Sequence, residues 1–418
     1  MIHLLEVRHY KCLRYIQQRL QPFQVLIGPN ASGKSTFLDV ITLLREIIQD
    51  GPEAAVERRA RSCRELVWMQ TGDDFEIAVE LKVPDDLAQQ HAYPFCRYEV
   101  RIGVDPDFGG VRSLVENFWL LSRKRNRFSR RQFHQPTLFP SERRVPKTIV
   151  HEPRKHTPPG RRKVMSITEK GRVYFRSETT DWSIRLGVVK DQAAFSKLPE
   201  EERFPIATWA KKVLTEGIRF LMLNSKAMRE PCRPDAPRTF QPDGSNLPKV
   251  IQTLRKEERS RFQQWLRHVR TFLPDVRDIT VKEREEDRYL YLRIRYTSGA
   301  VLPSWLISDG TLRFLALTLL PYLPERDVIY LIEEPENGIH PRAVEGVFQS
   351  LSSVYRGQVF LATHSPLVLG LASPEQILCF AQTRSGATDI VLGSDHPQLA
   401  DWKGEVDLSV LYAAGVLG

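Results

Sequence analysis

The chain has 418 residues, of which 41% are hydrophobic, and this is enough for one large or two ordinary domains with a well-buried core. Its net charge of +10 comes from one segment, because fourteen Lys or Arg and only two acidic residues lie between Arg123 and Lys163. No apolar run is long enough for a membrane helix and the N-terminus lacks a signal-peptide pattern, which argues against a membrane protein and predicts a cytoplasmic one.

The pattern of apolar residues predicts alternating strands and helices. IHLLEV and QVLIG near the N-terminus predict strands, and STFLDVITLLREII after them predicts a helix. RYEVRIGV, RVYFRSET and WSIRLGVV predict further strands, interrupted by a Pro- and Arg-rich loop. Apolar positions from Asn246 to Phe272 have helical spacing and predict one long helix with Asn246 as N-cap. DVIYLIEE and QVFLATHS predict buried parallel strands.

Residues 28–36, GPNASGKST, match the G-x-x-x-x-G-K-[ST] pattern and lie between a predicted strand and a predicted helix. In such a loop, backbone N–H groups surround the phosphates at the helix N-terminus, the lysine reaches the β and γ oxygens, and the first hydroxyl binds Mg²⁺. The sequence therefore predicts binding of ATP and Mg²⁺, with these nucleotide-binding residues: Gly28, Asn30, Gly33, Lys34, Ser35 and Thr36.

Polar residues follow the two predicted parallel strands. Glu333 and Glu334 end the first strand, where Glu333 is predicted to hold Mg²⁺ and Glu334 to activate the attacking water as general base. His364 follows the second strand and is predicted to sense the γ-phosphate. The alternatives are an acid pair that serves the next helix and a structural histidine. The carboxyl ends of parallel strands share one sheet edge, which favours a common site.

Ser308, Asp309 and Gly310 precede the helical run LRFLALTLL, so exposed N–H groups could bind a second anion there. One ATP does not need two phosphate cradles in one chain. This pattern predicts that the second cradle caps an ATP bound to a partner chain, which would make a homodimer around sandwiched ATP. An ordinary capped helix is the alternative.

In this order the P-loop, SDGT, LIEEPENGIHP and LATHSP resemble the ABC-type ATPases of the SMC, RecF and OLD group. The resemblance implies an α/β P-loop head built from both chain ends, residues 1–83 and 285–418. A mixed α+β lid or arm insertion would occupy residues 84–284, with a basic loop at 122–163. It also implies a signature loop at Ser308, Asp309 and Gly310, and a D-loop at the dimer interface with these residues: Asn337, Gly338 and His340.

The chain departs from this group at two positions. Glu333 stands where many relatives have Asp, and Asp309 replaces the first Gly of the S-G-G signature. Both variants fit the OLD-like subgroup, so we expect ATP hydrolysis that is slow or stimulated by a partner. Lys11 occupies the place of an Arg near the nucleotide in relatives. Gln70 is the candidate Q-loop residue near the metal, although its segment could equally be a sheet edge.

The resemblance implies the ATPase sensor of an anti-phage or DNA-surveillance system. No TOPRIM-like acidic cluster follows the ATPase, so an effector, such as a nuclease, would be a separate chain. The basic segment is predicted to contact nucleic acid or a partner through Arg123, Lys124, Arg125, Arg127, Arg130 and Arg131; a solvated loop is the alternative. A RecF-like repair ATPase and a non-hydrolysing ATP-locked scaffold remain alternatives. A transporter subunit is disfavoured because the insert is large.

Overall fold

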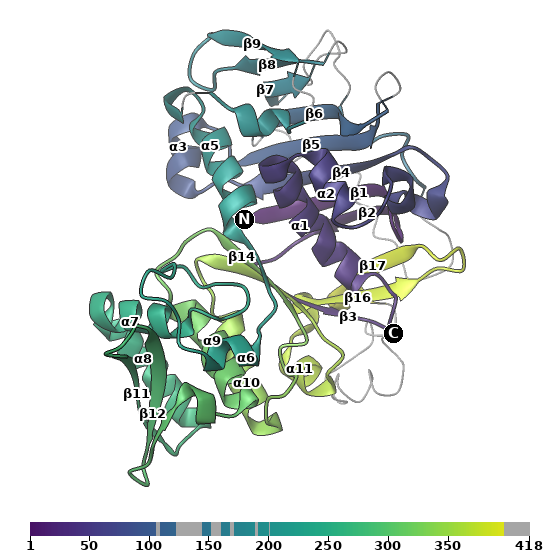
Figure 1. Cartoon of the computed structure of the whole chain (residues 1–418). Helices are drawn as coiled ribbons and strands as arrows, with labels where there is room; N and C mark the ends of the chain where they lie inside the picture. Colours follow the sequence, from purple (N-terminus) through teal and green to yellow (C-terminus); the bar gives the residue numbers. More distant parts are fainter. Residues whose placement is uncertain are drawn as a thin grey trace.

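The computed structural model describes residues 1–105, 109–122, 144–151, 160–167, 171–188, 191–199 and 201–396. The chain forms an eight-stranded sheet, a six-stranded sheet and a three-stranded sheet, with helices packed between and around them (Figure 1). In the described part of the chain, no helix has the length and apolar character needed to cross a membrane.

The eight-stranded sheet is antiparallel and has the order β2-β1-β4-β5-β6-β7-β8-β9. The strands predicted from RYEVRIGV, RVYFRSET and WSIRLGVV are confirmed as β5, β8 and β9. The strands are β1 (Ile2–Tyr10), β2 (Leu13–Arg19), β4 (Asp74–Lys82), β5 (Phe95–Val104), β6 (Val111–Leu121), β7 (Arg161–Ile167), β8 (Arg172–Arg176) and β9 (Ser183–Val188).

The predicted domain boundary at 83/84 falls inside this sheet. Strands β4 and β5 lie on either side of the boundary and pair from Asp74 opposite Gly103 to Lys82 opposite Phe95. The first part of the predicted insertion therefore extends the sheet that the N-terminal strands begin. The division into domains stays a prediction.

The six-stranded sheet brings the two chain ends together. Its order is β10-β14-β15-β3-β16-β17, and all neighbours are parallel except β16 and β17. Because β3 lies between β15 and β16, the prediction that both chain ends build one α/β head is confirmed. The strands are β3 (Phe23–Ile27), β10 (Ile218–Leu221), β14 (Val328–Glu333), β15 (Gly357–Ala362), β16 (Ile377–Gln382) and β17 (Thr388–Leu392).

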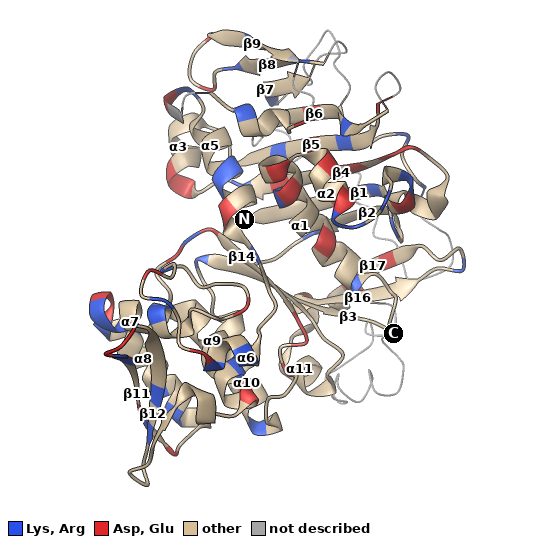
Figure 2. Ribbon diagram, viewed as in Figure 1, with Lys and Arg blue, Asp and Glu red and all other residues tan. Residues whose placement is uncertain are grey.

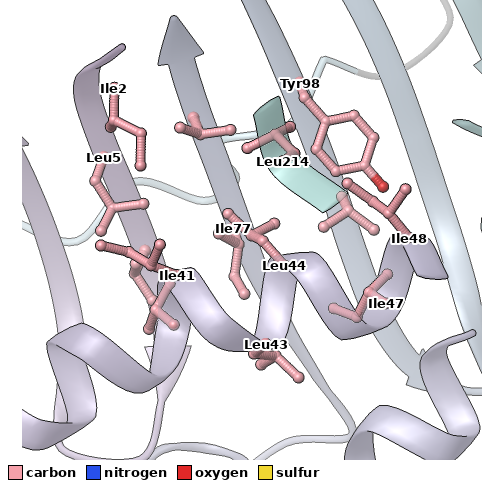
Figure 3. Close-up of a cluster of buried hydrophobic side chains, with 14 of the residues drawn as sticks. Ile2, Leu5, Ile41, Leu43, Leu44, Ile47, Ile48, Ile77, Tyr98 and Leu214 are labelled. Atoms are coloured by element: carbon pink, nitrogen blue, oxygen red, sulfur yellow. The ribbon is translucent and has the colours of Figure 1, made fainter. Parts of the chain in front are cut away.

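Helix α1 (Lys34–Asp50) lies between the two large sheets. Ile41, Leu44 and Ile48 on this helix belong to one buried cluster with Leu5 and Ile77 of the eight-stranded sheet (Figure 3). The same cluster contains Leu331 and Phe360 of the six-stranded sheet. Burial of each such side chain contributes about 1.5–3 kcal/mol, so α1 is held firmly between the two sheets.

The other face of the six-stranded sheet carries most of the remaining helices and the small sheet. The helices on this face are α6 (Ser225–Arg229), α7 (Leu247–Glu257), α8 (Arg259–Phe272), α9 (Asp309–Leu319), α10 (Pro341–Ser352) and α11 (Pro366–Leu371). The small sheet is antiparallel and comprises β11 (Val276–Glu283), β12 (Leu290–Tyr296) and β13 (Val301–Pro303). Three other helices accompany the eight-stranded sheet: α2 (Pro52–Glu57), α3 (Asp85–His91) and α5 (Pro205–Lys212).

The prediction of one long helix from Asn246 to Phe272 is wrong. The helix breaks at Glu258, whose backbone angles of φ −128° and ψ 54° are not helical. The break lets Leu254 of α7 and Trp265 of α8 pack into the same core, which one straight helix could not do. The Asn246 side chain does not cap α7 but bonds the Gln241 N–H at 2.9 Å and the Pro237 carbonyl at 2.8 Å.

Candidate nucleotide-binding site

The loop after β3 curves around the N-terminus of α1. Gly28, Ala31 and Gly33 have positive φ angles of 144°, 63° and 104°. A Cβ atom at Gly33 would lie 2.3 Å from Thr388 Oγ1, so only glycine fits there. Among the other predicted nucleotide-binding residues, Asn30 and Ser35 are exposed and Thr36 is half-buried.

Lys34 lies inside this loop. Its Nζ donates hydrogen bonds to the carbonyls of Gly28 at 2.8 Å and Pro29 at 2.9 Å. Burial lowers the pKa of Lys34 to about 8, while Glu333 and Glu334 raise it by a smaller amount. In the described chain no side chain caps α1 at Gly33, so the first N–H groups of this helix are available to an anion. This cradle fits the phosphates of a nucleotide.

The low pKa of Lys34 predicts proton uptake on ATP binding. At pH 8.5 the amine is mostly neutral, and anionic phosphates favour its ammonium form, so binding should take up a fraction of a proton and weaken as the pH rises above 8. Calorimetry in two buffers of different ionisation enthalpy measures the uptake. The Lys34→Arg variant, which stays charged, should show none. Equal heats in both buffers for the wild type would contradict the prediction.

Glu334 has a backbone conformation that is rare for its residue type. Its φ angle is 46°, and its N–H donates to the Ala362 carbonyl at 2.8 Å. The Asn337 N–H bonds the Glu334 carbonyl at 3.1 Å, and Asn337 Nδ2 donates to Glu334 Oε2. Such conformations cost about 1–3 kcal/mol and cluster at functional sites. The loop thus fixes the direction of the Glu334 carboxylate.

The loop that contains His364 is tied to the loop after β14. Ala362, the last residue of β15, is opposite Glu333 in the sheet register. Thr363 Oγ1 donates to Glu336 Oε1 at 2.5 Å. Burial, followed by the nearby Lys34 charge, lowers the pKa of His364, so the imidazole is neutral at neutral pH.

These elements line one cavity of about 790 Å³. The carboxyl ends of β14 and β15, the loops that follow them and the start of α1 contribute these lining residues: Lys34, Ser35, Glu333, Glu334, Asn337, Ala362 and His364. The structure therefore brings together the P-loop lysine, the acid pair and the histidine that the sequence predicts for one site.

The cavity is also lined by residues that sequence reasoning did not find. Residues 220–226 at the end of β10 line the cavity, together with Asp309 and Arg313 of α9. Arg313 donates a hydrogen bond to the Leu223 carbonyl at 3.1 Å. The only sequence signal was the short apolar run IRFLML before Asn224, which has the strand-then-polar pattern of the other site strands.

The predicted signature residues lie at the start of α9. The Ser308 side chain caps this helix, accepting from the Thr311 N–H at 3.3 Å, and Asp309 forms an ion pair with Arg229 at 2.7 Å. A Cβ atom at Gly310 would lie 2.2 Å from the Gly338 carbonyl, so the helix start packs directly on the predicted D-loop of the same chain. Asp309 lines the cavity of its own chain.

Other predicted residues lie outside the cavity. His340 caps α10, with Nδ1 accepting from the Arg342 N–H at 3.3 Å. Lys11 forms an ion pair with Asp39 at 2.7 Å. Gln70 ends the short turn Trp68–Gln70 with a φ angle of 56° and does not line the cavity. The predicted contact residues Arg123, Lys124, Arg125, Arg127, Arg130 and Arg131 lie outside the described residues.

The residues present suit a magnesium ion that arrives with phosphate. Ser35 and Glu333 both line the cavity. Within the described ranges, no group of three or more His, Cys, Asp or Glu side chains could hold a metal by itself. Mg²⁺ commonly binds one or two protein ligands together with substrate phosphates and waters, so this sparse set fits it.

Two protein families match the chain. Residues 155–370 match the family described as "AAA domain, putative AbiEii toxin, Type IV TA system", and residues 1–206 match the family described as "AAA ATPase domain". No curated protein matches the chain.

Several solved structures of SMC heads are similar over most of the chain. A SmcHead bound to the C-winged helix domain of ScpA is 15% identical, with 93% of this chain and 96% of that chain covered and a TM-score of 0.47. The Smc head with an extended coiled coil, bound to the C-terminal domain of ScpA from Pyrococcus furiosus, is 13% identical and has a TM-score of 0.45. The match covers 93% of this chain and 95% of that chain. The Thermotoga maritima SMC head is 10% identical, covers 94% and 98%, and has a TM-score of 0.42.

Proposed function

Because this chain belongs to the family of AAA domains described as "AAA domain, putative AbiEii toxin, Type IV TA system", we propose that it binds ATP with magnesium and hydrolyses it. The observation that carries this proposal is the shared cavity of Lys34, Glu334 and His364 at the edge of the six-stranded sheet. The loop N–H groups and Lys34 bind the phosphates, with Gly28, Asn30, Gly33 and Thr36 shaping the loop. A bound magnesium would neutralise phosphate charge, held by Ser35 and Glu333.

In this proposal Glu334 is the general base. Its carboxylate accepts a hydrogen bond from Asn337 and accepts the proton of the attacking water. His364, neutral because of burial and the Lys34 charge, contacts the γ-phosphate and stabilises charge there. Glu333, one residue earlier, is directed to the metal rather than to the water.

We further propose that two chains sandwich ATP. Ser308, Asp309 and Gly310 lie at an exposed helix N-terminus beside the predicted D-loop, where they can cap a nucleotide bound by a partner chain. The D-loop residues Asn337, Gly338 and His340 would then lie at the dimer interface. Asp309 also lines the cavity of its own chain, so an arrangement within one chain is the competing possibility.

Light scattering with and without nucleotide tests this switch. The wild type should be monomeric with ADP and approach twice that mass with ATP and magnesium. A Ser308→Arg variant, which places a long cation at the predicted interface, should stay monomeric with ATP. An ATP-bound wild type that remains monomeric at every protein concentration would place Ser308, Asp309 and Gly310 in a site of one chain.

The family description bears on the biological setting. The description of the matching family names a toxin of a toxin–antitoxin system, which favours a role in anti-phage defence or DNA surveillance with a separately encoded effector. In that setting the ATP state of the dimer would signal to the effector. A RecF-like repair ATPase would share the same site, and a non-hydrolysing scaffold would share its binding but not its turnover.

A further inference from the structure

The three-stranded sheet has one face in the core and one face toward solvent. Ile279, Leu292 and Ile294 point inward and are buried. Tyr291, Arg293 and Arg295 alternate with them on β12 and point to the opposite side, where Lys282 lies opposite Tyr291 in the register. We call Lys282, Tyr291, Arg293, Arg295 and the adjacent Trp305 the outer face.

The outer face combines two aromatic rings with unpaired positive charge. The Trp305 and Tyr291 rings lie 5.1 Å apart between centroids, and Trp305 is 45% exposed. Among the described residues, no salt bridge or hydrogen bond engages the side chains of Lys282, Arg293 or Arg295; Thr280 Oγ1 donates only to the Arg293 carbonyl. Asp278, the acid opposite Arg295, instead pairs with Arg255 at 3.7 Å. Figure 2 shows the basic residues of β11 and β12 in blue.

We propose that the outer face binds single-stranded nucleic acid. Arg293 and Arg295 are two residues apart on one side of a strand, about 6.8 Å along it, which suits successive phosphates of an extended chain. Trp305 and Tyr291 offer ring surface for stacking a base, and such platforms accept any base. The interaction goes beyond the proposed ATPase function and uses a surface other than residues 123–163.

The shape of the face favours a single strand over a duplex or an acidic peptide. The exposed Trp305 ring can stack on an unpaired base, whereas the bases of a duplex are already stacked on their neighbours. An acidic peptide would use the arginines but would leave the aromatic pair without a role. The hairpin tip beyond Lys282 carries the acidic residues Glu285 and Glu286, so the positively charged surface ends there.

The outer face is joined directly to the predicted signature loop. Five residues after the end of β13 at Pro303, the chain reaches Ser308, and Trp305 lies in the short turn between them. Arg229 holds this segment in place. Its carbonyl accepts a hydrogen bond from Ser304 Oγ at 2.7 Å, and its guanidinium donates to the Ile307 carbonyl at 3.0 Å and forms an ion pair with Asp309. A strand bound on the outer face can therefore bias the position of Asp309 beside the cavity.

Fluorescence anisotropy with a labelled oligo(dT) strand and the full chain at low salt tests the inference. The Arg293→Gln/Arg295→Gln variant should bind more weakly, and the slope of log affinity against log salt should fall by about 1.4. Trp305→Ala should weaken binding about tenfold, and Trp305→Phe should restore most of it. The control Arg326→Gln/Arg356→Gln removes two exposed arginines at the other end of the parallel sheet and should bind as the wild type.

Three results would overturn the inference. The first is that the wild type does not bind oligo(dT) at low salt. The second is that both outer-face variants bind oligo(dT) as the wild type does. The third is that the wild type binds poly-glutamate more tightly than oligo(dT), with an affinity that Trp305→Ala does not change. Basal ATP turnover, measured without nucleic acid, should be unchanged in these variants. If a variant loses DNA binding but keeps normal ATP turnover, the result supports the role of the outer face and leaves the proposed ATPase function untouched. If the wild type shows no ATP turnover, the result contradicts the proposed function and leaves the outer face untouched.

Discussion

Replacement of Glu334 by Gln is expected to reduce ATP turnover by a hundredfold or more while ATP binding persists. The amide keeps the size of the side chain and can still contact Asn337, but it cannot accept the proton of the attacking water. Phosphate release under saturating ATP measures the loss, and equilibrium binding of a fluorescent ATP analogue measures the retained affinity.

The control for this substitution is Glu345→Gln. Glu345 is an exposed acid on α10 that bonds Gln349 and does not line the cavity, so its loss should leave turnover unchanged. Turnover in Glu334→Gln within a fewfold of the wild type would remove Glu334 from the role of base.

Replacement of Lys34 by Ala should lower ATP affinity by at least tenfold and abolish turnover. The Lys34 ammonium of the wild type already lies inside the loop, bonded to the carbonyls of Gly28 and Pro29, so it can contact the phosphates of ATP with little rearrangement. A hydrogen bond to a charged group contributes about 1.5–3 kcal/mol, and 1.4 kcal/mol is tenfold in affinity. Calorimetric titration with ATP and magnesium measures the change.

The matched control here is Lys256→Ala, which removes an exposed lysine from α7. Thermal denaturation should show that both variants fold, since Lys34 is a buried charge whose removal does not leave a carboxylate buried and unpaired. An unchanged ATP affinity in Lys34→Ala would place the nucleotide elsewhere.

The acid pair, the histidine and the lysine of the site could be predicted because they depend on local patterns. Lys34 follows a glycine loop, and Glu334 and His364 each follow an apolar strand. Parallel strands end at one edge, and the register of β14, β15 and β3 confirms that these ends are neighbours. The four motifs also predicted an ATPase that resembles the SMC, RecF and OLD group, and the AAA-domain matches confirm an ATPase family.

The part of the site at the end of β10 could not be predicted because tertiary pairing decides it. Strand β10 (Ile218–Leu221) has only four residues and no motif, and its place at the edge of the sheet comes from pairing with β14. The break at Glu258 has no proline or glycine, so the sequence pattern did not predict that the helix ends there. Likewise, no local signal reveals that strands on both sides of residue 83 share one sheet.

Phosphate release from ATP by the purified wild-type chain with magnesium, assayed beside Glu334→Gln and Lys34→Ala, tests most directly whether this cavity hydrolyses ATP. We expect slow but saturable turnover in the wild type and none above background in either variant. Turnover that survives in both variants would contradict the assignment of the cavity. If the wild type binds ATP but releases no phosphate, hydrolysis is excluded for the chain alone and the ATP-locked scaffold takes its place.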